Sequence, residues 1–339
     1  MKVLLAADES DASNAVTHEV SARPWPARSE FWVLTALDPF FFTRAPLLLK
    51  ETEKKAIESL EETVLPLKQA GLAVKIDVVL ENPRHGIPRL ASEWNADLIV
   101  LGSRGRGALV RLLMGSTAQA VLRHAKCSVE IVRERRKEQR GFAEGMRILI
   151  PTDGSDYANH AAQSVAQRPW PAASEFRLIA VPELPVLAGD FPYYSTEQVA
   201  ELAKSTEGHA KEAAAKAAEF LIKAGLRVTS VITPAGDAPA RAILEAADAW
   251  SADLIVVGSH GRRGLDRIVL GSVSESIAMH AQCSVEVNRS THKIGGSGKR
   301  VSKNVARIGK SQTENQTRKC PLANGFAPKF RHRGAALAD

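Results

Sequence analysis

Residues 97–103 read Asp-Leu-Ile-Val-Leu-Gly-Ser, and residues 253–259 read Asp-Leu-Ile-Val-Val-Gly-Ser. Four consecutive apolar residues that end at a glycine are typical of a strand buried on both faces of a parallel sheet. The same pattern returns after 156 residues, which is the length of a domain rather than of a solenoid unit. This stretch therefore predicts one α/β domain that occurs twice.

A second duplicated stretch defines the extent of the repeat. Residues 23–31 read Arg-Pro-Trp-Pro-Ala-Arg-Ser-Glu-Phe and return, nearly unchanged, at residues 168–176, an offset of 145. The later part of the repeat is offset by 156, so eleven additional residues lie between, and we place them around Tyr194–Ala215. We define the first copy as residues 1–134, the second copy as residues 145–290 and a tail as residues 291–339.

Short apolar strands alternate with helical patterns within each copy. In the first copy, strands are expected at Lys2–Ala7, Phe31–Leu37, Val74–Val79, Asp97–Leu101 and Val129–Arg133. Helices are expected at Ala12–Ser21, Lys50–Ala70, Ile87–Trp94 and Ser116–His124. Gly71 and Gly225 follow the long helices, where a C-cap glycine belongs. The alternation predicts a doubly wound α/β fold for each copy.

The last strand of each copy has a different pattern. Residues Ser128–Val132 and Ser284–Asn288 alternate polar and apolar side chains. This alternation favours an edge strand with one exposed face, and edge strands need a partner or a cover. Two like edges in one chain therefore predict that the copies pair with each other as a pseudo-twofold unit.

The composition separates a folded part from a basic tail. The chain has 339 residues, 45% hydrophobic and 24% charged, which is ordinary for a globular protein, and no apolar run approaches the roughly 20 residues of a membrane span. The tail holds eleven Lys and Arg against two acids, so residues 1–290 carry a formal charge of −2. We therefore expect a disordered tail, no specific nucleic-acid binding and no membrane association.

The N-terminus and the cysteines indicate the compartment. The N-terminal apolar run is too short for a signal peptide, and three cysteines provide no disulfide framework or zinc spacing. A cytoplasmic location is the simplest interpretation. Cys127 and Cys283 occupy matching places, and we interpret them as buried structural thiols rather than redox groups.

A glycine motif follows the expected fourth strand of each copy. Residues 102–105 read Gly-Ser-Arg-Gly, and nine residues separate them from Gly115; residues 258–261 and Gly271 repeat this spacing. Glycines after a buried strand let the backbone approach a ligand closely. The next residues, Ser116 with Gln119 and Ser272 with Glu275, predict capping boxes at helix N-termini, which attract anions. The motif favours a phosphate site, and the alternative is a duplicated structural loop.

An acid lies at the end of the first strand of each copy. Ligands of doubly wound sheets bind beyond the carboxyl ends of strands at the switch point. If the first and fourth strands flank that point, Asp8 and Asp153 face the glycine loops and can bind ribose hydroxyls. The sequence contains no Ser-His-Asp, paired-carboxylate or zinc pattern, so no catalytic or metal-ligating residue is assigned.

These motifs resemble the universal stress protein family in its tandem form. The family signature of Gly, two residues, Gly, nine residues, Gly and Ser/Thr occurs in both copies, and the resemblance covers about residues 1–290. It implies five-stranded parallel sheets in the order 3-2-1-4-5, pairing of the domains through the fifth strands, and ATP binding, with Mg²⁺, in members that keep the signature. A homodimer is a further possibility under this resemblance.

The resemblance also implies a set of nucleotide-binding residues. In the first copy these are Ala6, Ala7, Asp8, Ala36 and Gly102 for adenosine, and Gly105, Gly115, Ser116 and Thr117 for phosphates. In the second copy they are Pro151, Thr152, Asp153, Ala180, Gly258, Gly261, Gly271, Ser272, Val273 and Ser274. The first copy has Ala118 where a hydroxyl residue is usual, so the second copy is expected to bind ATP better.

The function implied is that of an ATP-binding stress-response regulator or sensor rather than a dedicated enzyme. Two alternatives stay open: a slow ATPase, and a partner-binding module whose nucleotide sites are empty. Phosphate release would distinguish the first alternative, and nucleotide retained through purification would argue against the second.

Overall fold

The structure is a computed structural model that describes residues 1–8, 10–44, 46–105, 114–134, 144–184, 195–262 and 270–289. The tail at residues 291–339 lies outside the described residues, and so does the prediction that it is disordered. Most of the nine-residue segment inside each glycine motif also lies outside them, together with Cys320.

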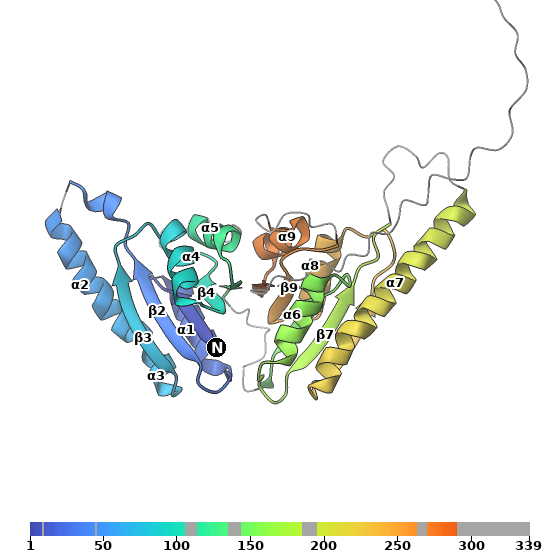
Figure 1. The fold of residues 1–339 in the computed structure, drawn as a ribbon, viewed down its shortest axis with the longest axis horizontal. Helices are drawn as coiled ribbons and strands as arrows, with labels where there is room; N and C mark the ends of the chain where they lie inside the picture. The colour runs from blue at the N-terminus through green and yellow to red at the C-terminus, as the bar shows by residue number, and fades with distance from the viewer. Residues whose placement is uncertain are drawn as a thin grey trace, which may run out of the picture. The chain divides into compact units, whose positions relative to one another are not determined.

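The first copy alternates strands and helices as predicted (Figure 1). Its elements are β1 (Lys2–Ala6), α1 (Asp11–Ala22), β2 (Glu30–Ala36), the 3₁₀ helix η1 (Pro39–Phe42), α2 (Pro46–Thr63), α3 (Leu65–Gln69), β3 (Ala73–Val79), α4 (Pro83–Trp94), β4 (Leu98–Gly102), α5 (Ser116–His124) and β5 (Ser128–Val132). Each predicted strand of this copy is confirmed, with bounds that differ by one residue at most.

Two helices of the first copy differ from their predicted bounds. The single helix expected over Lys50–Ala70 is divided into α2 and α3, because Pro66 has no N–H to continue the helical ladder. Helix α4 begins before the predicted Ile87, since the Asn82 side chain accepts a hydrogen bond from the backbone N–H of Arg84 at 3.0 Å.

The second copy repeats this order with one long helix. Its elements are β6 (Arg147–Pro151), α6 (Asp156–Ala166), β7 (Glu175–Ala180), α7 (Thr196–Lys223), β8 (Val228–Ile232), α8 (Pro239–Ala249), β9 (Leu254–Gly258), α9 (Ser272–His280) and β10 (Ser284–Asn288). Helix α7 has 28 residues against 18 for α2, so most of the stretch expected to hold the additional residues is helical. The predicted C-cap glycines are confirmed, with φ of +76° at Gly71 and +77° at Gly225.

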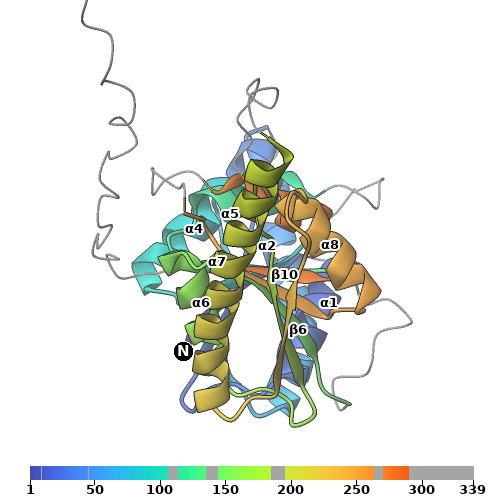
Figure 2. The ribbon, with the colours of Figure 1, turned by 90° about the vertical axis from the view of Figure 1, so that its right-hand side faces the viewer.

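The described strands form one ten-stranded sheet in the order β3-β2-β1-β4-β5-β10-β9-β6-β7-β8. Each copy therefore has the predicted order 3-2-1-4-5, with parallel pairs inside the copy. Helices α6 and α7 lie on one side of β6 and α8 lies on the other (Figure 2), as a doubly wound fold requires. Strands β5 and β10 pair antiparallel, which confirms the predicted contact between the copies.

The polar side of that strand pair is buried, so the predicted exposed face is wrong. Glu130 and Glu286 lie directly opposite each other, and their exposed fractions are 0% and 1%. An arginine of the same copy neutralises each carboxylate: Arg23 lies 2.8 Å from Glu130, and Arg168 lies 2.8 Å from Glu286. The alternating pattern therefore encodes a buried ionic layer between the copies.

The other side of the strand pair is apolar. Val129 and Ile131 of β5 belong to the same core cluster as Val285 and Val287 of β10. Two arginines also cross between the copies: Arg133 donates to the carbonyl of Ala278 at 2.7 Å, and Arg289 donates to the carbonyl of Leu122 at 2.6 Å. Each guanidinium binds a last-turn carbonyl of the other copy's final helix, where a cation is favourable.

The two described cysteines are buried, as predicted. Cys127 and Cys283 form no disulfide and are 5% and 6% exposed. Burial raises the pKa of Cys127 to about 11 and the pKa of Cys283 to about 12. Both thiols are therefore protonated at neutral pH, which favours the structural interpretation over a redox role.

None of the helices in the described ranges combines the length and the apolar character needed to cross a membrane.

Candidate functional site

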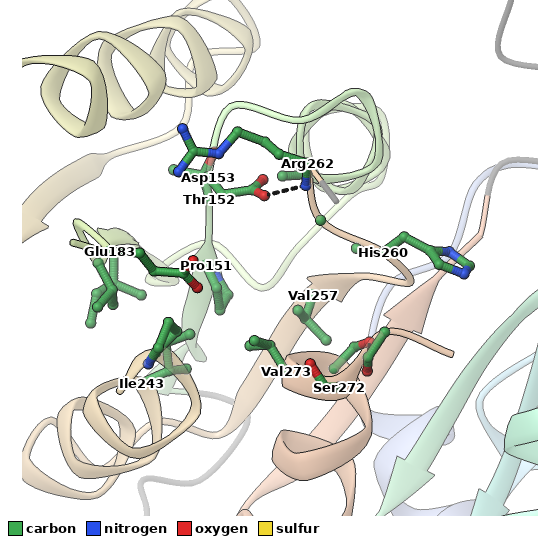
Figure 3. Close-up of a pocket in the computed structure, with 18 of the residues that line it drawn as sticks. Pro151, Thr152, Asp153, Glu183, Ile243, Val257, His260, Arg262, Ser272 and Val273 are labelled. Atoms are coloured by element: carbon green, nitrogen blue, oxygen red, sulfur yellow. Dashed lines mark hydrogen bonds between the residues drawn. The ribbon is translucent and has the colours of Figure 1, made fainter. Parts of the chain in front are cut away.

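A cavity of about 600 Å³ opens at the carboxyl ends of β6 and β9 in the second copy (Figure 3). The residues predicted there that line it are Pro151, Thr152, Asp153, Gly258, Gly261, Gly271, Ser272, Val273 and Ser274. The fold thus brings the end of the first strand to the glycine loop and the helix α9 N-terminus, both of which lie more than 100 residues later in the sequence.

Ala180 is the predicted residue of this copy that does not line the cavity. Its side chain is 1% exposed, and its carbonyl accepts a hydrogen bond from the backbone N–H of Thr233 at 3.1 Å. The next residue, Val181, lines the cavity instead. Successive side chains of an extended chain point to opposite sides, so a one-residue misplacement selects the wrong face. The offset of 145 pairs Ala36 with Val181 and would have found it.

The strand-end aspartate and the glycine loop face each other in both copies. Asp153 accepts hydrogen bonds from the backbone N–H of Ser155 at 3.0 Å and of Arg262 at 2.9 Å. A Cβ on Gly261 would lie 2.8 Å from Asp153 Oδ2, and a Cβ on Gly105 would lie 2.6 Å from Asp8 Oδ2. These glycines are therefore required for the close approach of the loop to the carboxylate.

The first glycine of each motif has a packing role. A Cβ on Gly258 would lie 2.7 Å from the carbonyl carbon of Tyr157, and a Cβ on Gly102 would lie 2.6 Å from Ala12 Cβ. Helices α6 and α1 thus pack directly on the ends of β9 and β4. For this glycine, the packing contacts support the alternative interpretation, in which the motif is a duplicated structural loop.

The glycine that precedes α9 is its N-cap, so the predicted capping boxes are wrong. Gly271 and Gly115 are the N-caps, and no side chain of the described residues caps either helix. The Gly271 N–H donates to the Ser259 carbonyl at 2.9 Å, and Gly115 donates equivalently to Ser103 at 2.8 Å. The N-cap glycine of α9 thus offers no side chain to the first-turn N–H groups at the cavity wall, an arrangement that attracts anions.

Ser274 holds this loop in place. It is 2% exposed, and its hydroxyl lies 2.8 Å from the Gly271 carbonyl and 3.0 Å from the Ser259 carbonyl. A hydroxyl has one proton to donate, and both of these carbonyl acceptors belong to the loop. Ala118 occupies the equivalent position of the first copy and cannot make this contact.

The rest of the lining comes largely from residues that the sequence did not single out, and most of these are apolar. They are Ala158, Ile179, Val181, Pro239, Ile243 and Val257, together with the polar Glu183, Thr206 and His260. Thr206 belongs to the longer α7, for which the first copy offers no counterpart in length. In Figure 3 the Glu183 side chain points into the cavity, whereas the His260 ring points away from it and lies 4.9 Å from the Tyr157 ring. Arg262, an arginine of the glycine loop, also lines the cavity.

The first copy presents a different set of contacts at the same place. Asp8 accepts hydrogen bonds from the Ser10 N–H at 3.1 Å and the Ser13 hydroxyl at 2.9 Å. The Arg84 guanidinium donates to the Ser116 hydroxyl at 2.8 Å, at the N-terminus of α5. The second copy has Ala240 at the position of Arg84, so the two copies differ in charge beside the final helix.

Comparison with known proteins gives one consistent result. The model of the universal stress protein family matches residues 1–133 and 146–289. Universal stress protein Rv2005c of Mycobacterium tuberculosis is 31% identical over 226 residues, covering 64% of this chain and 70% of that protein. A universal stress protein from Archaeoglobus fulgidus shares the fold, with a TM-score of 0.56 at 22% identity over 85% of this chain and 96% of its own. A universal stress protein solved in complex with cAMP is 26% identical, covers 39% of this chain and 96% of its own, and has a TM-score of 0.31.

Proposed function

This chain belongs to the universal stress protein family, and we propose that its second copy binds ATP in the cavity between β6 and β9. One observation carries the proposal: an apolar end, a strand-end carboxylate and a helix N-terminus line a single cavity. These three parts match the base, the ribose and the phosphates of a nucleotide. A volume of about 600 Å³ lies within the range of small-molecule sites.

Each part of the nucleotide is assigned to its own residues. The base lies against Ile179, Val181 and Ile243, and the ribose hydroxyls reach Asp153. The phosphates lie against the first-turn N–H groups of α9, at Ser272 and Val273. The crowding around Gly261 and Gly271 supports this, because glycine keeps the loop low enough to leave room above the helix N-terminus.

Bound ATP would bring Mg²⁺ on its phosphate oxygens. Within the described ranges, no three His, Cys, Asp or Glu side chains are grouped to hold a metal by themselves. Mg²⁺ is commonly held by substrate phosphates and water with few protein ligands. Metal binding is therefore proposed to depend on the nucleotide.

The role proposed for the bound nucleotide is regulation rather than turnover. Both Asp153 oxygens already accept backbone hydrogen bonds, from Ser155 and Arg262, which suits a positioning group better than a general base. We propose a sensor in which ATP occupancy is the signal, with weaker or no binding in the first copy. A slow ATPase would be recognised by steady-state phosphate release that Asp153→Asn abolishes.

Titration calorimetry with ATP on wild type, Gly271→Val and Gly115→Val tests the proposal. A Cβ at Gly271 would lie 3.1 Å from the Ser259 carbonyl oxygen and 3.2 Å from His260 Cα, so valine would displace the loop that faces the phosphates. The loss of two charge-assisted hydrogen bonds, at about 1.5–3 kcal/mol each, weakens binding by two orders of magnitude or more. We expect Gly271→Val to lose most ATP binding and Gly115→Val to lose little. Circular dichroism verifies that each variant is folded.

Two results would contradict the proposal. Equal ATP affinity in folded Gly271→Val and in wild type would remove the second copy from consideration as the binding site. A greater loss from Gly115→Val would reverse the order of the two copies.

A further inference from the structure

We propose that the Glu183 carboxylate selects the nucleotide base by accepting a hydrogen bond from an exocyclic amino group, so that the cavity prefers 6-amino over 6-oxo purines. This inference rests on the proposed nucleotide site and adds the residue that determines its base specificity.

The backbone around Glu183 directs its side chain into the cavity. Val181 and Glu183 are two residues apart and both line the cavity. Between them, the Pro182 carbonyl accepts a hydrogen bond from the Gly236 N–H at 3.1 Å. Leu184 packs on the same glycine, because a Cβ on Gly236 would lie 3.3 Å from Leu184 Cδ1. The chain is thus held from the Gly236 side, and Glu183 points into the cavity (Figure 3).

Apolar residues lie beside Glu183, so a hydrogen bond donated by the ligand would stabilise its carboxylate in the cavity. Figure 3 places Pro151 and Ile243 beside it, and Ile243 is 3% exposed. An ionised carboxylate accepts hydrogen bonds and has none to donate. The amino group of adenine donates to it, whereas the 6-oxo oxygen of hypoxanthine would bring two acceptors together. Sites built around such a hydrogen bond reject analogues that lack the donor.

The position of Glu183 in the cavity agrees with this assignment. The proposed phosphate-binding part lies at Gly271 and Ser272, and Glu183 faces it from the other side of the cavity, beside Pro151 (Figure 3). Asp153 lies on a third side, beside Arg262. The same carboxylate beside phosphates would repel them, so the two ends of the cavity cannot be exchanged.

The first copy uses the equivalent acid differently. Asp38 lies 145 residues before Glu183. Its carboxylate accepts hydrogen bonds from the Phe40 N–H at 3.0 Å and from the Asn82 side-chain amide at 2.6 Å, which hold the η1 turn. Asp38 thus belongs to a turn of the first copy, whereas Glu183 lines the cavity of the second copy.

Calorimetric titrations with ATP and ITP test the inference, since these ligands differ at the purine 6-position. We expect wild type to bind ATP at least about tenfold more tightly than ITP, the effect of one charge-assisted hydrogen bond. In Glu183→Gln the amide can donate to a 6-oxo oxygen, so the two affinities should converge to within about threefold. The control Glu245→Gln removes a largely exposed carboxylate of α8 and should keep the wild-type ratio.

The outcomes separate this inference from the proposed function. Equal ATP and ITP affinity in wild type, or an unchanged ratio in folded Glu183→Gln, would overturn base reading by Glu183 while nucleotide binding stands. Wild type that binds neither ligand would overturn both. A Glu183→Gln variant that loses all binding of both ligands would also refute base reading, because it would make the residue necessary for binding rather than for selection.

Discussion

The two buried carboxylates of the ionic layer between the copies, Glu130 and Glu286, are expected to contribute unequally to stability. Glu286 is 1% exposed and forms an ion pair with Arg168 at 2.8 Å. Arg23 has two acids, Glu130 at 2.8 Å and Glu19 at 3.9 Å. Although burial alone would lower the pKa of Arg23, the nearby carboxylates of Glu130 and Glu19 raise it above its usual value. In the first copy, Glu19 therefore provides a second negative charge beside the arginine. The second copy has Ser164 at the position of Glu19 and lacks that charge.

The charge-removing variants Glu286→Gln and Glu130→Gln test this difference. Removal of one partner from a buried ion pair costs about 3–5 kcal/mol, because the remaining charge is left uncompensated. We expect Glu286→Gln to approach this range. Glu130→Gln should cost at least about 1 kcal/mol less, since Glu19 still faces Arg23. Each variant equally removes the repulsion between the two opposed carboxylates, so that term cancels in the comparison.

Urea denaturation followed by circular dichroism measures both losses. The double variant Arg168→Met/Glu286→Gln serves as control and should recover part of the stability, because it leaves no buried cation without a carboxylate. The reasoning is refuted if Glu130→Gln destabilises the protein as much as Glu286→Gln. It is also refuted if the double variant is less stable than Glu286→Gln alone.

The remaining predictions concern a glycine pair and the buried thiols. Gly145 (φ +87°) has no room for a Cβ against the backbone of Ala173, whereas no atom lies within 4 Å of a Cβ on Gly71 (φ +76°). Gly145→Ala should therefore lower the free energy of unfolding in urea by well over the roughly 1–2 kcal/mol that left-handed strain costs in Gly71→Ala, and equal losses would contradict this. The pKa of Cys127 is raised to about 11 and that of Cys283 to about 12, so the folded state keeps these protons after the unfolded state has lost them. Stability should thus fall as pH rises above about 9, by on the order of 1 kcal/mol per thiol at about pH 10. Urea titrations from pH 8 to about 10 should show a shallower decline for Cys127→Ala/Cys283→Ala, and an identical decline would argue against thiol burial as the cause.

The fold could be predicted from the sequence because its decisive signals are local. The apolar run at Leu98–Leu101 and its repeat at Leu254–Val257 each specify a strand buried on both faces. The glycine after each run is required because a helix packs against it. In the sequence this glycine marks the end of the apolar run. The internal repeat then predicts a second domain of the same fold, and it predicts that the last strands of the two copies pair with each other.

The details that failed depend on contacts between distant residues. The alternation in β5 and β10 is compatible with solvent on the polar face, and only Arg23 and Arg168, more than 100 residues away from their partners, make that face a buried one. The capping boxes failed because a loop carbonyl, Ser259, takes the Gly271 N–H and moves the cap one residue earlier. Thr206 entered the cavity through a lengthening of α7 that has no matching signal in the first copy.

The two copies share the charged residues that pair at their interface but differ at the ligand end, and this contrast supports the proposed site in the second copy. At the interface, both copies carry an arginine in the Arg-Pro-Trp-Pro stretch, a glutamate in the last strand and a crossing arginine after it. At the ligand end they differ: Ser274 against Ala118, Ala240 against Arg84, and Glu183 against Asp38. Ser274 and Glu183 line the cavity of the second copy, whereas Asp38 and Arg84 bind elements of the first copy. A nucleotide bound to the second copy would lie against Gly258, and the next residue, Ser259, donates its N–H to the carbonyl of Asn288 at the end of β10. The proposed ligand loop is thus hydrogen-bonded to the strand that carries the interface.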